Sequence, residues 1–140
     1  MDQLVDLVHL MTKRNNTGTG GIAYLDVLCS NSWGYAFSSA LNNTTNFNFP
    51  NPSYTWNLMV CSHEIGHNIE SHHTHWCGWP GGPIDNCVDV EGSCANNPTP
   101  QVGTIMSYCH TTSAGSLIDF HSIVRTTFKC NSSPIVSSSS

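Results

Sequence analysis

Charged side chains are scarce in this sequence, and basic ones most of all. Only 9% of the 140 residues are charged, whereas a soluble domain usually carries about 25%. Lys and Arg number 4 against 9 Asp and Glu, for a formal net charge of -5. Because nucleic acids and anionic membrane surfaces are held by clustered Lys and Arg, this scarcity argues against both as partners.

Long apolar runs are also missing. No run approaches the roughly 18 residues that a membrane span needs, so no such span is predicted. The first residues lack the basic and apolar regions of a secretory leader. The length itself predicts one domain with a modest core.

Cysteine and histidine are abundant by contrast, at 7 and 8 residues. Cysteine at this density favours an oxidising compartment, because disulfides compensate for a small core. We therefore expect a secreted, extracellular protein whose leader lies upstream of this sequence, or a fragment of one. The odd count predicts one unpaired cysteine.

Hydrophobic periodicity divides the first half of the chain into four elements. An apolar stripe at helical spacing, residues 4–11, predicts a short amphipathic helix. Residues 22–29 are apolar on both faces except for Asp26, which predicts a buried strand. Residues 30–53 show no steady period and predict a long loop. A second helix is expected near residues 54–69, with Ser53 as its N-cap.

The second half is poor in regular patterns. Residues 76–104 hold too many Gly and Pro for helices or strands, so we expect cysteines to hold this segment. Residues 117–124 are apolar and predict a closing helix or short strand. Residues 132–140 form a Ser-rich tail or linker.

Five of the eight histidines lie between residues 63 and 75. His63, Glu64 and His67 form an HExxH motif on the predicted helix, which places both imidazoles on one face, one turn apart. Two such imidazoles can share a tetrahedral zinc, while the adjacent glutamate reaches a water at the metal. The alternative is a polar helix face in a His-rich segment.

A catalytic zinc needs a third protein ligand, and three candidates follow, at His72, His73 and His75. The spacing that ends at His73 is the long metzincin spacing. That pattern also requires a downstream Met-turn, which residues 103–108 (GTIMSY) supply. We expect His72 and His75 to be neighbours of the site or exposed residues, and His9, His110 and His121 to be structural or solvated.

These motifs identify a family resemblance. The sequence resembles the metzincin zinc endopeptidases and, within them, is most similar to the adamalysin/reprolysin group and its bacterial reprolysin-like relatives. The resemblance rests on DLVHL at residues 6–10, GIAYL at 21–25, HEIGHN at 63–68, HTHWC at 73–77 and TIMSYCH at 104–110. It implies an α+β, metzincin-like zincin, with a mixed sheet and the active-site helix in an upper subdomain and an irregular, disulfide-stapled lower subdomain.

The resemblance also implies an incomplete N-terminus, because the first strands and helix of that family have no counterpart here. Residues 1–131 would be the C-terminal part of the catalytic domain. Residue roles carry over position by position: His63, His67 and His73 as zinc ligands, Glu64 as general base, Met106 as the packing residue beneath the metal and Tyr108 as a hydroxyl near it. Residues 22–28 match the edge strand that pairs with an extended substrate.

Two positions depart from the family pattern. Glu70 stands where the pattern has Gly, at a sharp turn where a positive φ costs a residue other than glycine roughly 1 kcal/mol or more. Glu70 could bend by another route, hold a neighbouring histidine, or weaken zinc binding. Thr74 replaces the Asp that usually follows the third histidine.

For the cysteines, the resemblance implies a pair of Cys29 with Cys130 and leaves Cys61 free. The other four would pair around the loop, and they are Cys77, Cys87, Cys94 and Cys109. A structural zinc site that these cysteines form with His75 or His110 is the alternative, which their long, irregular gaps disfavour. Four oxygen-bearing residues of the same loop could hold calcium, although a solvated acidic loop is favoured; they are Asp85, Asn86, Asp89 and Glu91.

These features predict a monomeric, secreted zinc endopeptidase that acts on peptide or protein substrates. Water activated by zinc would attack the peptide bond, with Glu64 as general base. The alternative is an inactive or truncated homologue that serves as a binding module.

Overall fold

The structure, a computed structural model, describes residues 6–28, 32–44, 53–95 and 102–128. Three short strands form a mixed sheet in the order β1-β3-β2, with β1 at Val8–Met11, β2 at Gly21–Ala23 and β3 at Tyr35–Ser38. β1 runs parallel to β3, and β2 runs antiparallel to β3 at an edge of this sheet. With the helix described below, the chain is a small α+β protein.

The first predicted element is wrong in type, because residues 8–11 form β1 instead of a helix. Four apolar residues at helical spacing are too few to decide the backbone conformation, and pairing with β3 overrides them. The pairing is in register from Val8 opposite Tyr35 to Met11 opposite Ser38. The His9 ring also lies 2.8 Å from the Ser38 hydroxyl, through Nε2.

The next two predictions need correction as well. The strand expected at residues 22–29 is limited to β2, because Asp26 has a left-handed φ of 55° and the amides of Val27 and Leu28 bond to Asn68 at the end of the helix. The loop expected at residues 30–53 contains β3. The segments 29–31 and 45–52 lie outside the described residues, and so do Cys29 and Cys130.

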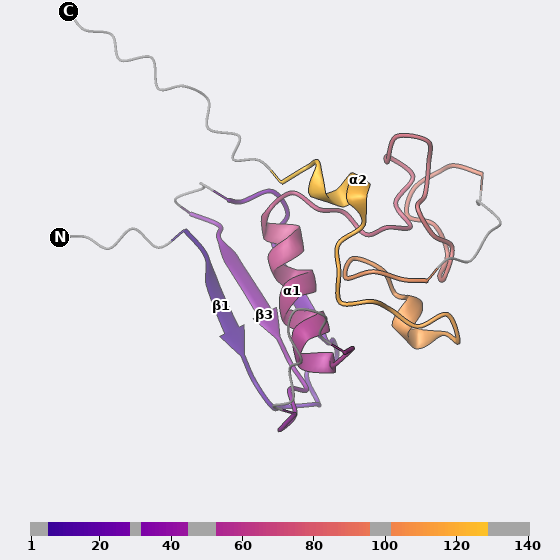
Figure 1. Cartoon of the computed structure of the whole chain (residues 1–140). Coiled ribbons are helices and arrows are strands. Elements are labelled where there is room, and N and C mark those ends of the chain that lie inside the picture. Colours follow the sequence, from indigo (N-terminus) through magenta and orange to yellow (C-terminus); the bar gives the residue numbers. More distant parts are fainter. Residues whose placement is uncertain (1–5, 29–31, 45–52, 96–101, 129–140) are drawn as a thin grey trace, which may run out of the picture.

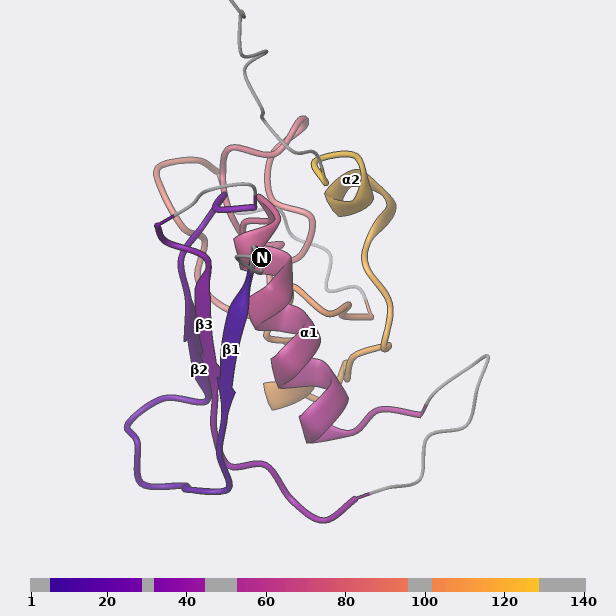
Figure 2. The same cartoon turned by 90° about the vertical axis from the view of Figure 1, so that its left-hand side faces the viewer.

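The predicted central helix is confirmed as α1, at Trp56–Asn68. Its N-cap is Thr55 instead of Ser53, because Thr55 directly precedes the first helical residue and its hydroxyl accepts from the Leu58 amide at 3.3 Å. α1 lies between the sheet and the irregular second half of the chain (Figure 1). From the side, the three strands stand together along one flank of α1 (Figure 2).

The hydrophobic core lies on the side of α1 away from the sheet. It joins one helix residue to four from the second half: Met59, Trp79, Ile105, Met106 and Val124. Gly66 of α1 lies so close to Met106 that a Cβ at position 66 would overlap the Met106 sulfur. The opposite face of the sheet stays open, with Leu10 62%, Ile22 64% and Tyr35 53% exposed.

The second half has little regular structure, as predicted. Its described residues hold two isolated bridges, a 3-10 turn at Cys109–Thr111 and the short helix α2 at Ser122–Arg125. The closing element predicted at 117–124 is thus helical only at its end. Within the described residues, no helix is long and apolar enough to cross a membrane. The tail at 132–140 lies outside them.

Two disulfides join the four loop cysteines, Cys77 to Cys94 and Cys87 to Cys109. The expectation that these four pair with one another is confirmed, and a structural zinc site made from their thiols is excluded. Cys61 carries a free thiol, as predicted. The predicted Cys29–Cys130 pair falls outside the described residues.

Candidate active site

The histidine site is built where α1 ends. His63 and His67 project from one face of α1, one turn apart, with their Nε2 atoms 3.2 Å apart. The chain then turns back at Glu70, which has a φ of 82°, and the Ser71 amide bonds to the Gly66 carbonyl at 2.9 Å. Glu70 therefore adopts the left-handed turn that the family pattern assigns to Gly.

This turn brings His73 back to the helix. Its Nε2 lies 3.1 Å from that of His67 and 3.2 Å from that of His63. Two ligands of a tetrahedral zinc, each bound at about 2.0 to 2.1 Å, stand about 3.3 to 3.4 Å apart. The three nitrogens thus form a triangle of nearly the size that such an ion needs.

Each ring is oriented by a bond at its other nitrogen. His63 Nδ1 lies 2.7 Å from the Ile105 carbonyl, and His67 Nδ1 lies 2.7 Å from the Ser71 carbonyl. His73 Nδ1 lies 2.5 Å from the Glu91 carboxylate. These three oxygens are hydrogen-bond acceptors, so each Nδ1 must be the donor. In a neutral ring the proton is then on Nδ1, and Nε2 keeps its lone pair.

Burial also keeps the rings of His63 and His67 uncharged. Burial, reinforced by the charge of His67, lowers the pKa of His63 to about 3, even though the Ile105 carbonyl opposes the shift. Burial and the charge of His73 likewise lower the pKa of His67 to about 4. A histidine binds a metal through its neutral imidazole, so this set of donors fits a metal such as zinc.

Glu64 lies between the histidines and the edge strand β2. Its side chain is buried, and burial raises the pKa of its carboxyl to about 7. The carboxylate packs directly against Gly21, where a Cβ would overlap it. A cleft of about 240 Å³ opens beside Glu64 and is lined in part by Trp56, Val60 and Tyr108.

The Met-turn, residues 103–108, packs against the segment that carries His73. Met106 is fully buried, and its carbonyl accepts from the Thr74 amide at 3.0 Å. Two residues on, the Tyr108 hydroxyl lies 3.1 Å from His73 Nε2, so this predicted residue reaches the histidine triangle. Burial raises the pKa of Tyr108, which keeps its hydroxyl protonated.

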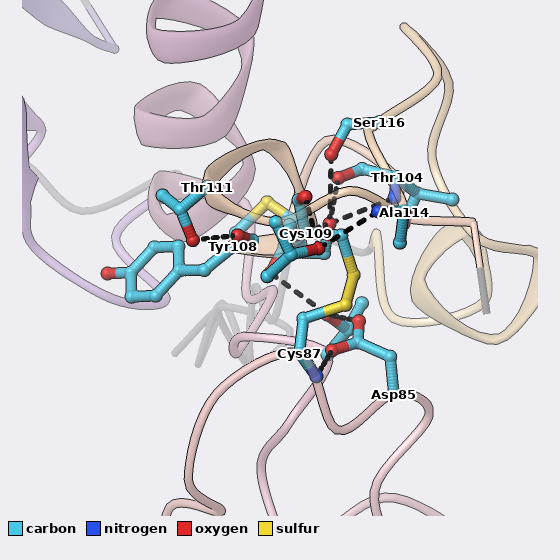
Figure 3. The surroundings of a disulfide bond; sticks show 12 residues. Asp85, Cys87, Thr104, Tyr108, Cys109, Thr111, Ala114 and Ser116 are labelled. Carbon is cyan, nitrogen blue, oxygen red and sulfur yellow. Dashed lines mark hydrogen bonds between the residues drawn. A yellow bond between two sulfur atoms is a disulfide. The ribbon is translucent and has the colours of Figure 1, made fainter. Parts of the chain in front are cut away.

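Asp85 is one residue whose place the sequence did not predict. It is buried beside Thr74 and accepts a hydrogen bond from its hydroxyl, so it supplies a carboxylate next to the position where the family pattern has Asp. Asp85 also accepts from the Cys87 amide at 3.2 Å. Figure 3 shows the Cys87–Cys109 disulfide with Asp85 beside Cys87, and Tyr108 preceding Cys109.

Glu91 is the second residue whose place the sequence did not predict. Its Oε1 lies 2.5 Å from His73 Nδ1 and 3.2 Å from His75 Nε2. Burial alone would raise the pKa of Glu91, but the hydrogen bonds and charges of His73 and His75 together outweigh it, so the pKa is lowered. Asp85 and Glu91 thus face separate partners, which does not support a shared calcium site. No motif signals either contact, because each carboxylate follows its partner by more than ten residues of irregular chain.

The remaining histidines take supporting positions. His75 is 2% exposed and sits behind His73, whereas His72 stacks on Trp76 with ring centroids 3.7 Å apart. His110 lines the cleft. His121 caps α2, where its Nδ1 accepts from the Ile123 amide at 3.3 Å.

Comparison with protein families matches the first half of this sequence to a known group. Residues 1–74 match the family described as metallo-peptidase family M12B, reprolysin-like. The match spans just over half of the chain and ends directly after His73. A comparison with curated proteins found no match.

Proposed function

The chain belongs to the reprolysin-like M12B metallopeptidases, and from this premise we propose that it is a secreted zinc-dependent endopeptidase that hydrolyses protein substrates. His63, His67 and His73 hold the zinc, Glu64 is the general base, and Tyr108 assists. The observation that carries the proposal is the triangle of three Nε2 atoms, 3.1 to 3.2 Å apart, with a buried carboxylate beside it.

When bound, zinc would lower the pKa of a water to about 7 and polarise the scissile carbonyl. Glu64 accepts the proton of the attacking water and passes it to the leaving amine. The protonated Tyr108 hydroxyl donates to the oxygen on which negative charge develops.

The substrate would be an extended peptide lying antiparallel to β2. In antiparallel pairing, alternate residues of β2 bond to β3, so the backbone groups of Ala23 face the open edge. A peptide added there passes Gly21 and reaches Glu64. The two disulfides support secretion. We assign the chain to a metzincin-like catalytic domain that acts as a monomer without nucleic-acid or membrane partners.

An inactive binding module is the competing function. The open apolar face of the sheet favours it, since exposed patches often mark contact surfaces. The intact ligand triangle and Glu64 favour the enzyme, because a binding module needs neither.

Glu64→Ala tests the mechanism. The variant should keep one zinc per chain and lose cleavage of a denatured protein substrate by at least about 100-fold, the lower range for a general base. Asp119→Asn is the matched control, because the Asp119 carboxylate is exposed and pairs with Arg125 instead of with a proposed ligand. Unchanged turnover by Glu64→Ala contradicts the mechanism, and zinc-loaded wild type that cleaves no peptide supports the binding module.

A further inference from the structure

Glu91 lies in an irregular loop, yet its backbone is held firmly against the segment that follows His73. Its amide donates to the His75 carbonyl at 3.0 Å, and its carbonyl accepts from the Cys77 amide at 2.9 Å. The Cys77–Cys94 disulfide closes the same loop around it. These two backbone hydrogen bonds fix the position of the Glu91 Cα atom, so the contact of its side chain with His73 follows from the path of the loop.

The Glu91 carboxylate distinguishes His73 from the other two proposed ligands. His63 and His67 donate to neutral backbone carbonyls, whereas His73 donates to a charged group at 2.5 Å. Hydrogen bonds to charged acceptors are roughly twice as strong as neutral ones. A carboxylate behind a metal-bound imidazole holds its tautomer and orientation and makes it a stronger ligand.

The geometry argues against a second ion on the same residues. One nitrogen of His73, one of His75 and one oxygen of Glu91 gather closely enough to be considered as a metal group. Two atoms bound to one ion at about 2.0 to 2.2 Å stand more than about 3 Å apart. The 2.5 Å between His73 and Glu91 fits a shared proton instead.

We propose that Glu91 is a positioning residue, which orients His73 and strengthens its bond to the metal. The proposal rests on the proposed function, since it requires that His73 is a zinc ligand. It assigns to the irregular loop a defined part in the site: a carboxylate that supports the third ligand. His75, buried behind His73, is the second donor to the same oxygen and fixes the carboxylate in turn.

The test measures zinc affinity of the full chain by competition with a chelator, with no substrate present. Glu91→Gln keeps the side-chain shape and removes the charge, and we expect the zinc dissociation constant to rise about 10-fold. Glu91→Leu removes the acceptor as well, for a rise approaching about 100-fold. Asp89→Asn changes the same charge in the same loop and should leave the dissociation constant unchanged.

Two further readouts separate positioning from a general loss of structure. The unfolding temperature of the zinc-free protein should be the same for Glu91→Gln and Asp89→Asn. The visible spectrum of the cobalt-substituted protein should change for Glu91→Gln alone, because the field of one nitrogen ligand is altered. Equal zinc affinity of Glu91→Gln and wild type overturns the proposal, as does an equal loss with Asp89→Asn. Wild type that binds no zinc overturns the proposed function itself.

Discussion

The two halves of this molecule are ordered by different means. Residues 8–68 contain all three strands and α1, held by backbone hydrogen bonds. The described residues beyond 70 contain only isolated bridges, a 3-10 turn and a four-residue helix. Yet most of the buried apolar core comes from this second half. Regular backbone and hydrophobic core therefore do not coincide: the regular half leaves one apolar face open, while the irregular half is held by packing and disulfides.

The proposed site lies at the boundary between the two halves and takes residues from both. His63, Glu64 and His67 come from the regular half, and Tyr108 and Glu91 from the irregular one. His73 stands just past the turn that separates them. The family match ends at residue 74, so the recognised pattern covers the regular half, and the surroundings of the site are completed by the other.

Zinc should have the largest effect, because it would join the two halves. An ion that binds only the folded chain, at a free concentration 1,000 times its dissociation constant, adds about 4 kcal/mol to the free energy of unfolding. Thermal unfolding with zinc and after chelation measures this difference. Magnesium, which prefers oxygen ligands, is the control and should give no shift. Equal unfolding temperatures with zinc and chelator would contradict the ligand assignment.

Removing the Cys77–Cys94 disulfide should come second and weaken the irregular half selectively. The double change to Ala opens a loop of sequence separation 17, for a loss of about 3 kcal/mol in the free energy of unfolding. Urea unfolding measures the loss, and hydrogen exchange should show that amides of α1 stay protected longest. Cys61→Ala breaks no disulfide and should cost much less. If the two variants lose equally, the irregular half does not depend on this disulfide.

Gly21→Ala tests the contribution of the regular half, through strand β2. The new methyl group would overlap the Glu64 carboxylate and displace it, so kcat/KM should fall by roughly 10-fold to 100-fold while zinc affinity is kept. Gly18→Ala is the control: its φ of 79° makes alanine strained there and should cost some stability, but nothing beyond its chain neighbours lies within 4 Å of its Cβ position, so Glu64 should stay in place and kcat/KM should be kept. Steady-state cleavage with a zinc titration tests this, and a loss of zinc by Gly21→Ala would show that the strand supports the ligands instead of the base.

Glu70→Gly should have the smallest effect and the opposite sign. At a φ of 82°, glycine relieves the backbone cost of a Cβ, which should raise the free energy of unfolding by up to about 1 kcal/mol. Glu70→Ala keeps the Cβ and should bring no such gain. Chemical unfolding of both variants gives the comparison, and equal stabilisation would place the cost of Glu70 in its carboxylate instead of its backbone.

Local patterns predicted the parts that depend on neighbours along the chain. HExxH on a helical period predicts that two imidazoles share a face, and α1 has that geometry. The density of Gly and Pro predicted the irregular loop. The free thiol at Cys61 was implied by the family resemblance and not by a local pattern. The strands β1 and β3 were missed, because their pairing joins residues more than twenty positions apart in the chain.

The sequence by itself determined the chemistry of the site: which side chains can bind a metal, and which carboxylate lies beside them. Only the tertiary structure decided what surrounds them. It bends the chain through a left-handed Glu70, and it brings Asp85 to Thr74 and Glu91 to His73. The physical reason is range. Helical spacing acts over four residues, whereas these contacts depend on a loop path set by two disulfides and a core that no local pattern describes.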